Sequence, residues 1–362
     1  GGAFENPQRF GGSDVMSRIG YERSHPGTLR KSLRRALNAG LKDIYKELGI
    51  DRHEVYEAMV VANSTMRDLF FDIDVKSIGE MPYKSLTEHA MLRGEADSTW
   101  VTKRAYELGI LIHPQARVVG APLIASHVGG DVAADLVATD FGSAPGSSLL
   151  IDIGTNTEIV ATDGERFVAA SSPAGPAFEG GMLRFGMAGA DGAIEAVHIN
   201  DDEFVYQVIG DYEPEGICGS GLVDIIAELR RVEWMDPQGR FEHGGTEYTI
   251  APSRGITFSR ADASQLAQAK ASNASGQRIL LRKLGLDAGD VDHVYLAGGF
   301  ANAIDIENAI EIGFLAQVKP ENVERVGNSA LRGAAKLLLS RRRREALNDI
   351  IGRIEHVELE TE

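Results

Sequence analysis

The expected fold is decided by the stretch SLLIDIGTNTEIVATDGERFVAAS, residues 148–171, in which strand-like runs alternate with tight turns. The runs cover residues 149–153, 158–162 and 166–170, and Asp163-Gly164 separates the last two. Runs of this length with Asp-Gly between them are typical of strands joined by hairpins. We therefore predict a three-stranded meander.

The first turn, Gly154-Thr155-Asn156-Thr157, has the composition of a phosphate-binding loop. Glycine lets the backbone approach a ligand, and the three polar residues supply hydroxyl and amide donors for phosphate oxygens. Asp152, in the strand before the turn, is placed to hold a hydrated divalent cation. The alternative is a purely structural hairpin in which Asp152 caps its own turn.

Composition narrows the class of protein. The 362 residues suit two or three domains. The excess of 53 acidic over 37 basic residues disfavours nonspecific binding to nucleic acid or an anionic membrane, which needs a basic surface. No apolar run reaches the roughly 18 residues of a transmembrane helix, and no secretory signal opens the sequence. We expect a soluble cytoplasmic protein.

The sequence has one cysteine, Cys218. A single cysteine excludes an intrachain disulfide and a cysteine-ligated iron–sulfur cluster within these residues. We expect Cys218 to be a small buried residue rather than a redox ligand.

Two further glycine-rich turns, GICGSG (216–221) and AGGF (297–300), lie at the ends of predicted strands and lead into helices. The free backbone N–H groups at a helix N-terminus form a ready anion site. The strands LLIDI and VYLA would be neighbours in one sheet, so the turns that follow them would border one cleft. Tight helix packing, or a turn with unusual φ, would explain the same glycines without a ligand.

Periodicity and composition predict the remaining elements. Leucines at four-residue spacing indicate an amphipathic helix over 28–48, and small residues at 127–140 indicate a helix packed closely against a neighbour. The other predictions are a helix at 99–108, glycine-rich loops through 172–200 and one continuous helix at 329–351.

A hairpin with DxGTN, followed later by a strand that ends in LAGGF before a helix, resembles the acetate and sugar kinase, heat-shock protein and actin (ASKHA) ATPase superfamily. The resemblance implies an α/β fold of two RNase H-like lobes around a nucleotide cleft. It also implies that the hairpin turn is a phosphate loop and that the Gly-Gly turn lies against adenosine. A composition break at 141–148 (FGSAPGSS) divides a first lobe, 1–147, from a second, 148–362.

Longer phrases make the resemblance more specific, and together they look like the ATP-dependent reductive activators of corrinoid proteins. The phrases cover nearly the whole chain in one order, and PAGPAFEGG and GICGSGLVD are far more specific than the general ATPase turns. They are NPQ with FGGSDVMSRI (6–19), NSTM (63–66), LLIDIGTNTEIV (149–160), SSPAGPAFEGG (171–181), GICGSGLVDIIAEL (216–229), LAGGFANAID (296–305) and VGNSALRGA (326–334).

This resemblance implies that ATP binding or hydrolysis enables a one-electron reduction of an inactive Co(II) corrinoid to Co(I). The corrinoid would belong to a partner protein of a methyltransferase system. ATP and Mg²⁺ would be the ligands, a low-potential electron donor a second partner, and a homodimer the assembly. The implied catalytic residues are Asp152, which also holds the metal, and Glu179. The implied nucleotide contacts are Gly154, Thr155, Asn156, Thr157, Gly219, Ser220, Gly221, Gly298, Gly299 and Phe300.

The sequence departs from the family pattern in two ways. Many family members carry an iron–sulfur domain, which one cysteine cannot provide, so we expect any cluster on a missing N-terminal domain or on a separate partner. The superfamily also opens its first lobe with a DxGTT-like hairpin, whereas this sequence starts at NPQ, about where that hairpin would have ended. We therefore expect a first lobe without its opening hairpin, and this chain alone as only the ATPase part.

Two other functions stay open at this point. A small-molecule kinase of the same superfamily would need a catalytic Asp in a substrate pocket between the lobes. A non-catalytic docking or dimerisation module would need no intact nucleotide site. Glu179 could brace its loop instead of acting as an acid or base, and Lys270 could be a solvated helix residue instead of a nucleotide contact.

Overall fold

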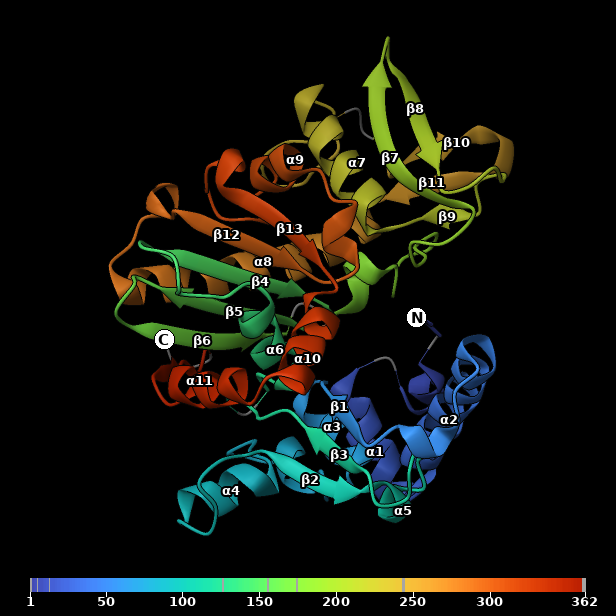
Figure 1. Cartoon of the computed structure of the whole chain (residues 1–362). Coiled ribbons are helices and arrows are strands. Elements are labelled where there is room, and N and C mark those ends of the chain that lie inside the picture. Colours follow the sequence, from blue (N-terminus) through green and yellow to red (C-terminus); the bar gives the residue numbers. More distant parts are fainter. Residues whose placement is uncertain are drawn as a thin grey trace. The chain divides into compact units, whose positions relative to one another are not determined.

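The computed structural model describes residues 2–4, 6–12, 14–125, 127–154, 156–173, 175–242 and 245–359, without the side chains of Pro176 and Glu179. The chain divides into two compact units, each discontinuous in sequence (Figure 1). Unit 1 comprises residues 1–143 and 329–356, and unit 2 comprises 144–328 and 357–362. The chain therefore leaves unit 1 close to the expected lobe boundary and returns to it near the end. The assignment of lobes to 1–147 and 148–362 stays a prediction.

Unit 1 combines helices with a small sheet of order β1-β3-β2, in which β1 runs parallel and β2 antiparallel to β3. Its strands are β1 (Glu57–Val60), β2 (Val101–Arg104), β3 (Arg117–Gly120) and, near the end of the chain, β14 (Ile354–His356). Its helices are α1 (Val15–Ser24), α2 (Thr28–Leu48), α3 (Ser64–Phe70), α4 (Leu86–Leu92), α5 (Ala105–Leu108), α6 (Gly130–Ala138), α10 (Ser329–Leu339) and α11 (Arg341–Ile351). Short 3₁₀ turns cover Pro7–Gly11, Arg52–Glu54 and Lys76–Gly79.

Helix α2 confirms the helix predicted over 28–48. Its apolar face packs on a core that includes the buried residues Phe70, Phe71 and Val118. Gly49, with φ of 65°, ends the helix in the left-handed conformation that glycine adopts without a Cβ penalty. The residues of α2 that form this face are Leu33, Leu37, Leu41 and Tyr45.

A buried ion pair ties α3 to the loops around it. Arg67 and Asp68 are fully inaccessible, and their side chains lie 2.7 Å apart. Arg67 also donates to the carbonyl oxygens of Thr99 (2.8 Å) and Ala121 (3.1 Å). A buried charge is tolerated only when such partners satisfy it, so this pair makes the packing of α3 specific.

Helices α6 and α10 are in direct backbone contact. A Cβ placed on Gly333 of α10 would come within 1.9 Å of the carbonyl oxygen of Ala134, so only glycine fits there. The hydroxyl of Ser329 donates to Asp135 at 2.6 Å. This contact confirms the closely packed small-residue helix predicted near 127–140.

The single helix predicted over 329–351 is wrong, because the chain breaks at Ser340. Ser340 is extended (φ −141°, ψ 111°), and its side chain accepts from the backbone N–H of Arg343 as the N-cap of α11. Arg344 donates to the carbonyl oxygens of Leu337 and Leu338, which the end of α10 leaves without helical partners. Side-chain capping therefore replaces two helical hydrogen bonds at this turn.

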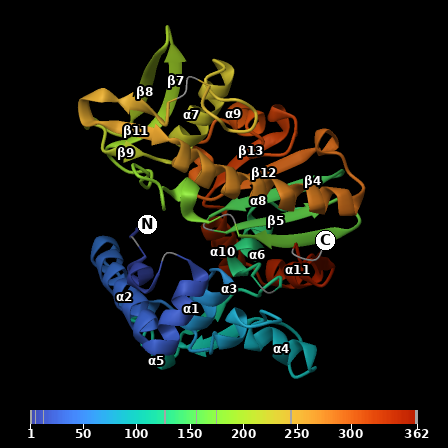
Figure 2. The ribbon, with the colours of Figure 1, turned by 180° about the vertical axis from the view of Figure 1, so that it is seen from behind.

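Unit 2 is built on a sheet in which β13, β12, β4, β5 and β6 follow one another, and the predicted meander β4-β5-β6 is confirmed. Helix α8 lies along one face of this sheet (Figure 2). The strands are β4 (Ser148–Ile153), β5 (Thr157–Thr162), β6 (Phe167–Ser172), β7 (Ala193–Asn200), β8 (Glu203–Val208), β9 (Gly216–Ile217), β10 (Glu247–Ala251), β11 (Ile256–Ser259), β12 (His293–Ala297) and β13 (Val323–Gly327). The helices are α7 (Gly219–Arg231), α8 (Arg260–Leu284) and α9 (Ile306–Glu311), with 3₁₀ turns at Pro176–Glu179, Pro252–Arg254, Ala288–Asp290, Phe300–Asn302 and Pro320–Asn322.

Two sequence predictions are corrected by these elements. The helix predicted at 99–108 is wrong over 101–104, which form β2 antiparallel to β3. The loops predicted through 172–200 end earlier, because 193–200 form β7, which pairs with β8. Both errors come from short segments in which strand pairing, a long-range contact, outweighs local composition. None of the described helices has both the length and the apolar composition needed to span a bilayer.

Candidate functional site

The first glycine-rich turn connects β4 to β5. Asp152 lies one residue before the end of β4, opposite Glu158 of β5 and beside Ala297 of β12. The backbone N–H of Gly154 donates to the carbonyl oxygen of Asn156 at 3.0 Å, which closes the turn. Thr155 lies outside the described residues. The hairpin that was predicted from the sequence therefore holds Asp152 at the edge where parallel strands β4 and β12 end.

The Gly-Gly turn after β12 touches this hairpin. Gly298 has φ of 100°, and a Cβ on it would lie 2.3 Å from the carbonyl oxygen of Ile153 and 3.3 Å from the Asp152 Oδ1. Its N–H donates to the carbonyl oxygen of Gly327 at the end of β13, at 3.1 Å. Gly299 has an ordinary φ of −64° and no atom near its Cβ position. Gly298 is thus the residue that lets the ends of β4, β12 and β13 meet.

The third turn, at the start of α7, contacts the Gly-Gly turn at Phe300. A Cβ on Gly219 would lie 2.2 Å from the carbonyl oxygen of Phe178 and 2.5 Å from the ring of Phe300. The N-cap, Cys218, makes no side-chain cap, and the first N–H groups of a helix have no acceptor within it. The N-terminus of α7 therefore lies beside the residue that follows the Gly-Gly turn.

The other residues of this third turn are used for packing. The Ser220 hydroxyl donates to the carbonyl oxygen of Glu195 at 2.7 Å, and a Cβ on Gly221 would lie 2.5 Å from the carbonyl oxygen of Ile194. Cys218 is buried, with its sulfur 3.4 Å from that same Ile194 oxygen, as expected for a small buried residue. These contacts hold α7 against β7.

An aromatic cluster lies beside the Gly-Gly turn and the start of α7. The Phe178 ring lies 5.9 Å from Phe300 and 4.8 Å from Phe314, between centroids. Phe178 belongs to the 3₁₀ turn Pro176–Glu179, so the phrase PAGPAFEGG is placed beside the turns. The side chain of Glu179 lies outside the described residues. Phe314 was not singled out in the sequence, where no pattern separates it from other core phenylalanines.

Two carboxylates share one face of the sheet at this edge. Gly276 of α8 packs on Ile159 and Ser172, so their neighbours Glu158 and Ser171 point to the opposite face. Asp152 shares that face because it is paired with Glu158. The Ser171 hydroxyl donates to Glu158 at 3.2 Å. Asp152 and Glu158 are therefore neighbours on that face of the sheet.

The donor set fits Mg²⁺ held largely through water. Mg²⁺ is commonly bound by one or two carboxylates together with phosphates and waters. Asp152 and Glu158 provide such a pair, and the described part of the chain has no group of three or more acidic, histidine or cysteine side chains suited to a metal. Glu158 was not among the sequence candidates, although its place opposite Asp152 follows from the hairpin register.

Other sequence candidates lie differently. Thr157 is fully buried, its hydroxyl has no hydrogen-bond partner among the described residues, and it pairs with Ile153 on the face toward α8. Lys270 of α8 is half-buried, with its Nζ 3.6 Å from a Cβ placed on Gly313. Burial, followed by the nearby charges of Arg230 and Arg278, lowers the pKa of Lys270.

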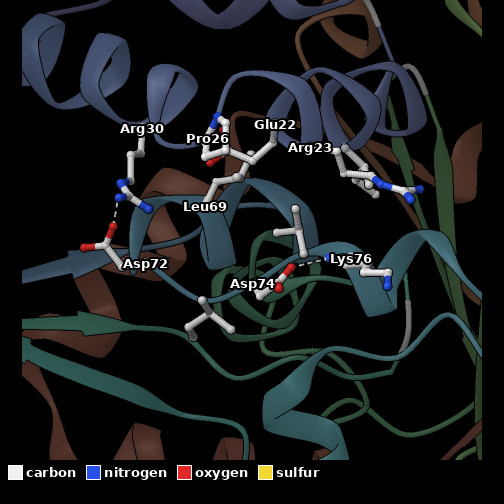
Figure 3. A pocket seen from close by; sticks show the side chains of 11 residues that line it. Glu22, Arg23, Pro26, Arg30, Leu69, Asp72, Asp74 and Lys76 are labelled. Atoms are coloured by element: carbon white, nitrogen blue, oxygen red, sulfur yellow. Dashed lines mark hydrogen bonds and ion pairs between the residues drawn. The ribbon is translucent and has the colours of Figure 1, made fainter.

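A separate cavity of about 460 Å³ lies in unit 1 and shares no residue with the glycine turns. Figure 3 shows Arg30 directed at Asp72, 2.6 Å away, and Asp74 accepting from the N–H of Lys76 at 2.8 Å. Asp72 neutralises Arg30, and Asp74 adds a second negative charge, so the cavity is a poor site for a nucleotide.

An α/β unit with three glycine-rich turns and a carboxylate pair at one edge of its sheet has the features of an ASKHA nucleotide-binding domain. Residues 146–362 match the family model described as the C-terminal domain of RACo, the ASKHA domain, and residues 2–144 match the RACo middle region. The chain belongs to the RACo family. The two-lobed α/β class expected from the sequence is confirmed.

Curated relatives and a solved structure support this assignment. The chain is 30% identical to the corrinoid activation enzyme RamQ of Eubacterium limosum, over 99% of this chain and 63% of that protein. It is 24% identical to a [Co(II) methylated amine-specific corrinoid protein] reductase of Methanosarcina barkeri, over 86% of this chain and 60% of that protein. A solved reductive activator for a corrinoid, iron–sulfur protein shares 33% identity, with a TM-score of 0.84, over 99% of this chain and 59% of that one. The chain thus spans about three fifths of the length of these relatives.

Proposed function

We propose that this chain is the nucleotide-dependent part of a reductive activator of a corrinoid protein. The observation that carries the proposal is a pair of close contacts: Gly298, after β12, lies against Ile153 and Asp152 of β4, and Gly219, at the start of α7, lies against Phe300 of the Gly-Gly turn. The family relationship and the activities for which the relatives are named support the same reaction class.

The proposed roles follow from the contacts at the edge of the sheet. Asp152, with Glu158 opposite, holds hydrated Mg²⁺. The backbone N–H groups of the β4–β5 turn other than that of Gly154, which closes the turn, and those at the N-terminus of α7 bind phosphate oxygens. Gly298, Gly299 and Phe300 border the adenosine, and bound Mg²⁺ would neutralise phosphate charge. Glu179 as an acid or base is proposed from sequence alone.

The reaction itself takes place on the partner. One electron passes from a low-potential donor to the Co(II) corrinoid of a partner protein and gives Co(I). This chain, with one cysteine, supplies docking and a nucleotide-dependent change of conformation. Nucleotide can drive such a change only if it binds one arrangement more tightly than another. Cytoplasmic location and a homodimer are parts of the same proposal.

The test is Asp152→Ala, with Asp163→Ala as a matched control at the opposite end of the same meander. The protein is mixed with ATP, Mg²⁺, a low-potential reductant and a purified Co(II) corrinoid protein, and Co(I) absorbance is followed. We expect Asp152→Ala to lower the ATP-dependent rate on the order of 100-fold, with circular dichroism unchanged, because the carboxylate that would hold Mg²⁺ against the phosphates is lost. Asp163→Ala should form Co(I) at the ATP-dependent rate of the wild type.

Other outcomes would select other functions. Unchanged nucleotide affinity and turnover in Asp152→Ala would refute the role of Asp152. Phosphorylation of a small metabolite by the wild-type chain would favour a kinase. Tight binding to the corrinoid protein without any effect of ATP would favour a docking module.

A further inference from the structure

The charge of this chain is divided unequally between its two units. Unit 1 contains 24 basic and 22 acidic residues, whereas unit 2 contains 13 basic and 31 acidic ones. The net charge of −16 therefore comes from unit 2, which contains the candidate nucleotide site. An acidic macromolecule would be repelled by unit 2 and would meet no net repulsion at unit 1.

Within unit 1, helix α2 presents an exposed basic stripe, defined as Lys31, Arg35, Lys42 and Lys46. Their spacings of 4, 7 and 4 residues bring all four to one side of a helix of 3.6 residues per turn. Lys31 and Lys46 are about 22 Å apart at a rise of 1.5 Å per residue. The apolar positions of α2 lie on the opposite side, against the core of unit 1.

The four side chains of the stripe make no ion pair or hydrogen bond with the residues that the structure describes. Other basic residues of the same helix behave differently. Arg30 and Arg34 turn toward Asp72, at 2.6 and 2.9 Å, and Figure 3 shows Arg30 in this position. The helix thus separates cations that stabilise unit 1 from cations that face outward.

The stripe works against the stability of its own helix. Lys31 and Arg35, and likewise Lys42 and Lys46, are like charges at i and i+4, an arrangement that destabilises a helix. Among the positions three and four residues from each member, Asp43 is the one carboxylate. Stability of the fold therefore does not explain this pattern.

We infer that the basic stripe of α2 is a docking surface for an acidic face of the corrinoid protein. The inference rests on the proposed function for the identity of this partner. Charge complementarity selects an acidic protein, because opposite charges across an interface steer association. A partner held at α2 would approach unit 1, the unit without the net negative charge.

The experiment compares two double charge reversals. Arg35→Glu/Lys42→Glu removes the centre of the stripe. Arg341→Glu/Arg342→Glu, on α11 of the same unit, changes the net charge equally at two exposed arginines that also have no described partner. Association of each protein with the purified corrinoid protein is measured by stopped flow between 20 and 300 mM NaCl, alongside thermal unfolding.

We expect the α2 variant to associate about 10-fold more slowly than wild type at low salt, with a flatter salt dependence. The α11 variant should stay within about 3-fold of wild type. An equal decrease of the association rate in both variants would mean that only the net charge matters, and this result would overturn the inference. An association rate of the α2 variant equal to that of wild type would also overturn the inference. Sedimentation showing that the stripe joins two copies of this chain would overturn it as well.

The docking surface and the proposed function can fail separately. If wild type binds the corrinoid protein but ATP never promotes Co(I) formation, the function fails while the stripe can still be shown to dock. If ATP-dependent reduction is normal in the α2 variant and its association is unchanged, docking at the basic stripe is refuted and the proposed function is supported. If wild type does not bind the corrinoid protein at any salt concentration, both fail.

Discussion

At the scale of single residues, Gly298 and Gly299 are adjacent, but only Gly298 occupies a position that requires glycine. Gly298 combines a φ of 100° with a Cβ position 2.3 Å from a carbonyl oxygen, and Gly299 has neither constraint. The sequence identifies both glycines but not which one is indispensable, because φ depends on how β12, β4 and β13 end together. The burial of Thr157 is similar, since only the register of the sheet decides which face it occupies.

This difference yields a prediction about the Gly-Gly turn. Gly298→Ala should lower the free energy of unfolding by about 1–3 kcal/mol, because alanine is strained at this φ and overlaps the Ile153 oxygen. It should also weaken ATP binding, since the turn must move away from Asp152. Chemical denaturation and a nucleotide titration would measure the two effects. Gly299→Ala is the control, and equal losses in both variants would contradict the argument.

At the scale of elements, local patterns gave correct predictions where one face of a segment decides its structure. The helix at 28–48 and the meander at 148–172 both follow from their own periodicity. The β7–β8 hairpin and the break at Ser340 could not be predicted in this way. The hairpin depends on strand pairing, and the break depends on the cap formed by the Ser340 side chain. The site followed this rule: each turn was predicted, and so was the pairing of β4 with β12, whereas the contact of Gly219 with Phe300 depends on how α7 packs.

Helix α7 covers an edge of the smaller sheet with two carboxylates. Strand β9 pairs only with the first residues of β7, so the N–H groups of Val197 and Ile199 donate to Asp224 (3.2 Å) and Glu228 (2.6 Å) instead. Burial favours the neutral form of Glu228, but hydrogen bonds from Arg231 and Ile199 outweigh it and lower the pKa of Glu228. Burial raises the pKa of Asp224.

These shifts predict a pH dependence of stability. Because the pKa of Glu228 is lower in the folded state, its contribution is complete above the unfolded value of about 4.3 and is lost as pH falls through the folded pKa. Glu228→Gln should therefore cost about 1–2 kcal/mol at pH 7, and this difference should shrink between pH 5 and pH 3.

Urea denaturation of both proteins at several pH values would measure this difference. Asp224 has the opposite sign, since protonation favours its folded form and its contribution falls as pH rises through its raised pKa. It is present in both proteins and cancels in the comparison. A difference that stays constant down to pH 3 would show that Glu228 acts without its charge.

At the scale of the whole molecule, 31 acidic residues against 13 basic ones in unit 2 imply self-repulsion. Raising NaCl from 10 to 150 mM shortens the screening distance to about 8 Å. The apparent melting temperature should therefore rise, by roughly 1–3 °C. Differential scanning calorimetry would measure it. The variant Arg341→Glu/Arg342→Glu is more acidic, so its melting temperature should rise further with salt. A melting temperature that falls as salt is added would contradict this explanation.

The return of α10 to unit 1 sets the order in which the molecule can be completed during synthesis. Ser329 meets Asp135 across 194 positions of sequence, and Gly333 fits only against Ala134. A ribosome therefore delivers α6 long before its partner helix, and residues 144–328 of unit 2 emerge between them. Until the last helices leave the exit tunnel, the apolar side of α6 is uncovered and is a natural binding site for chaperones.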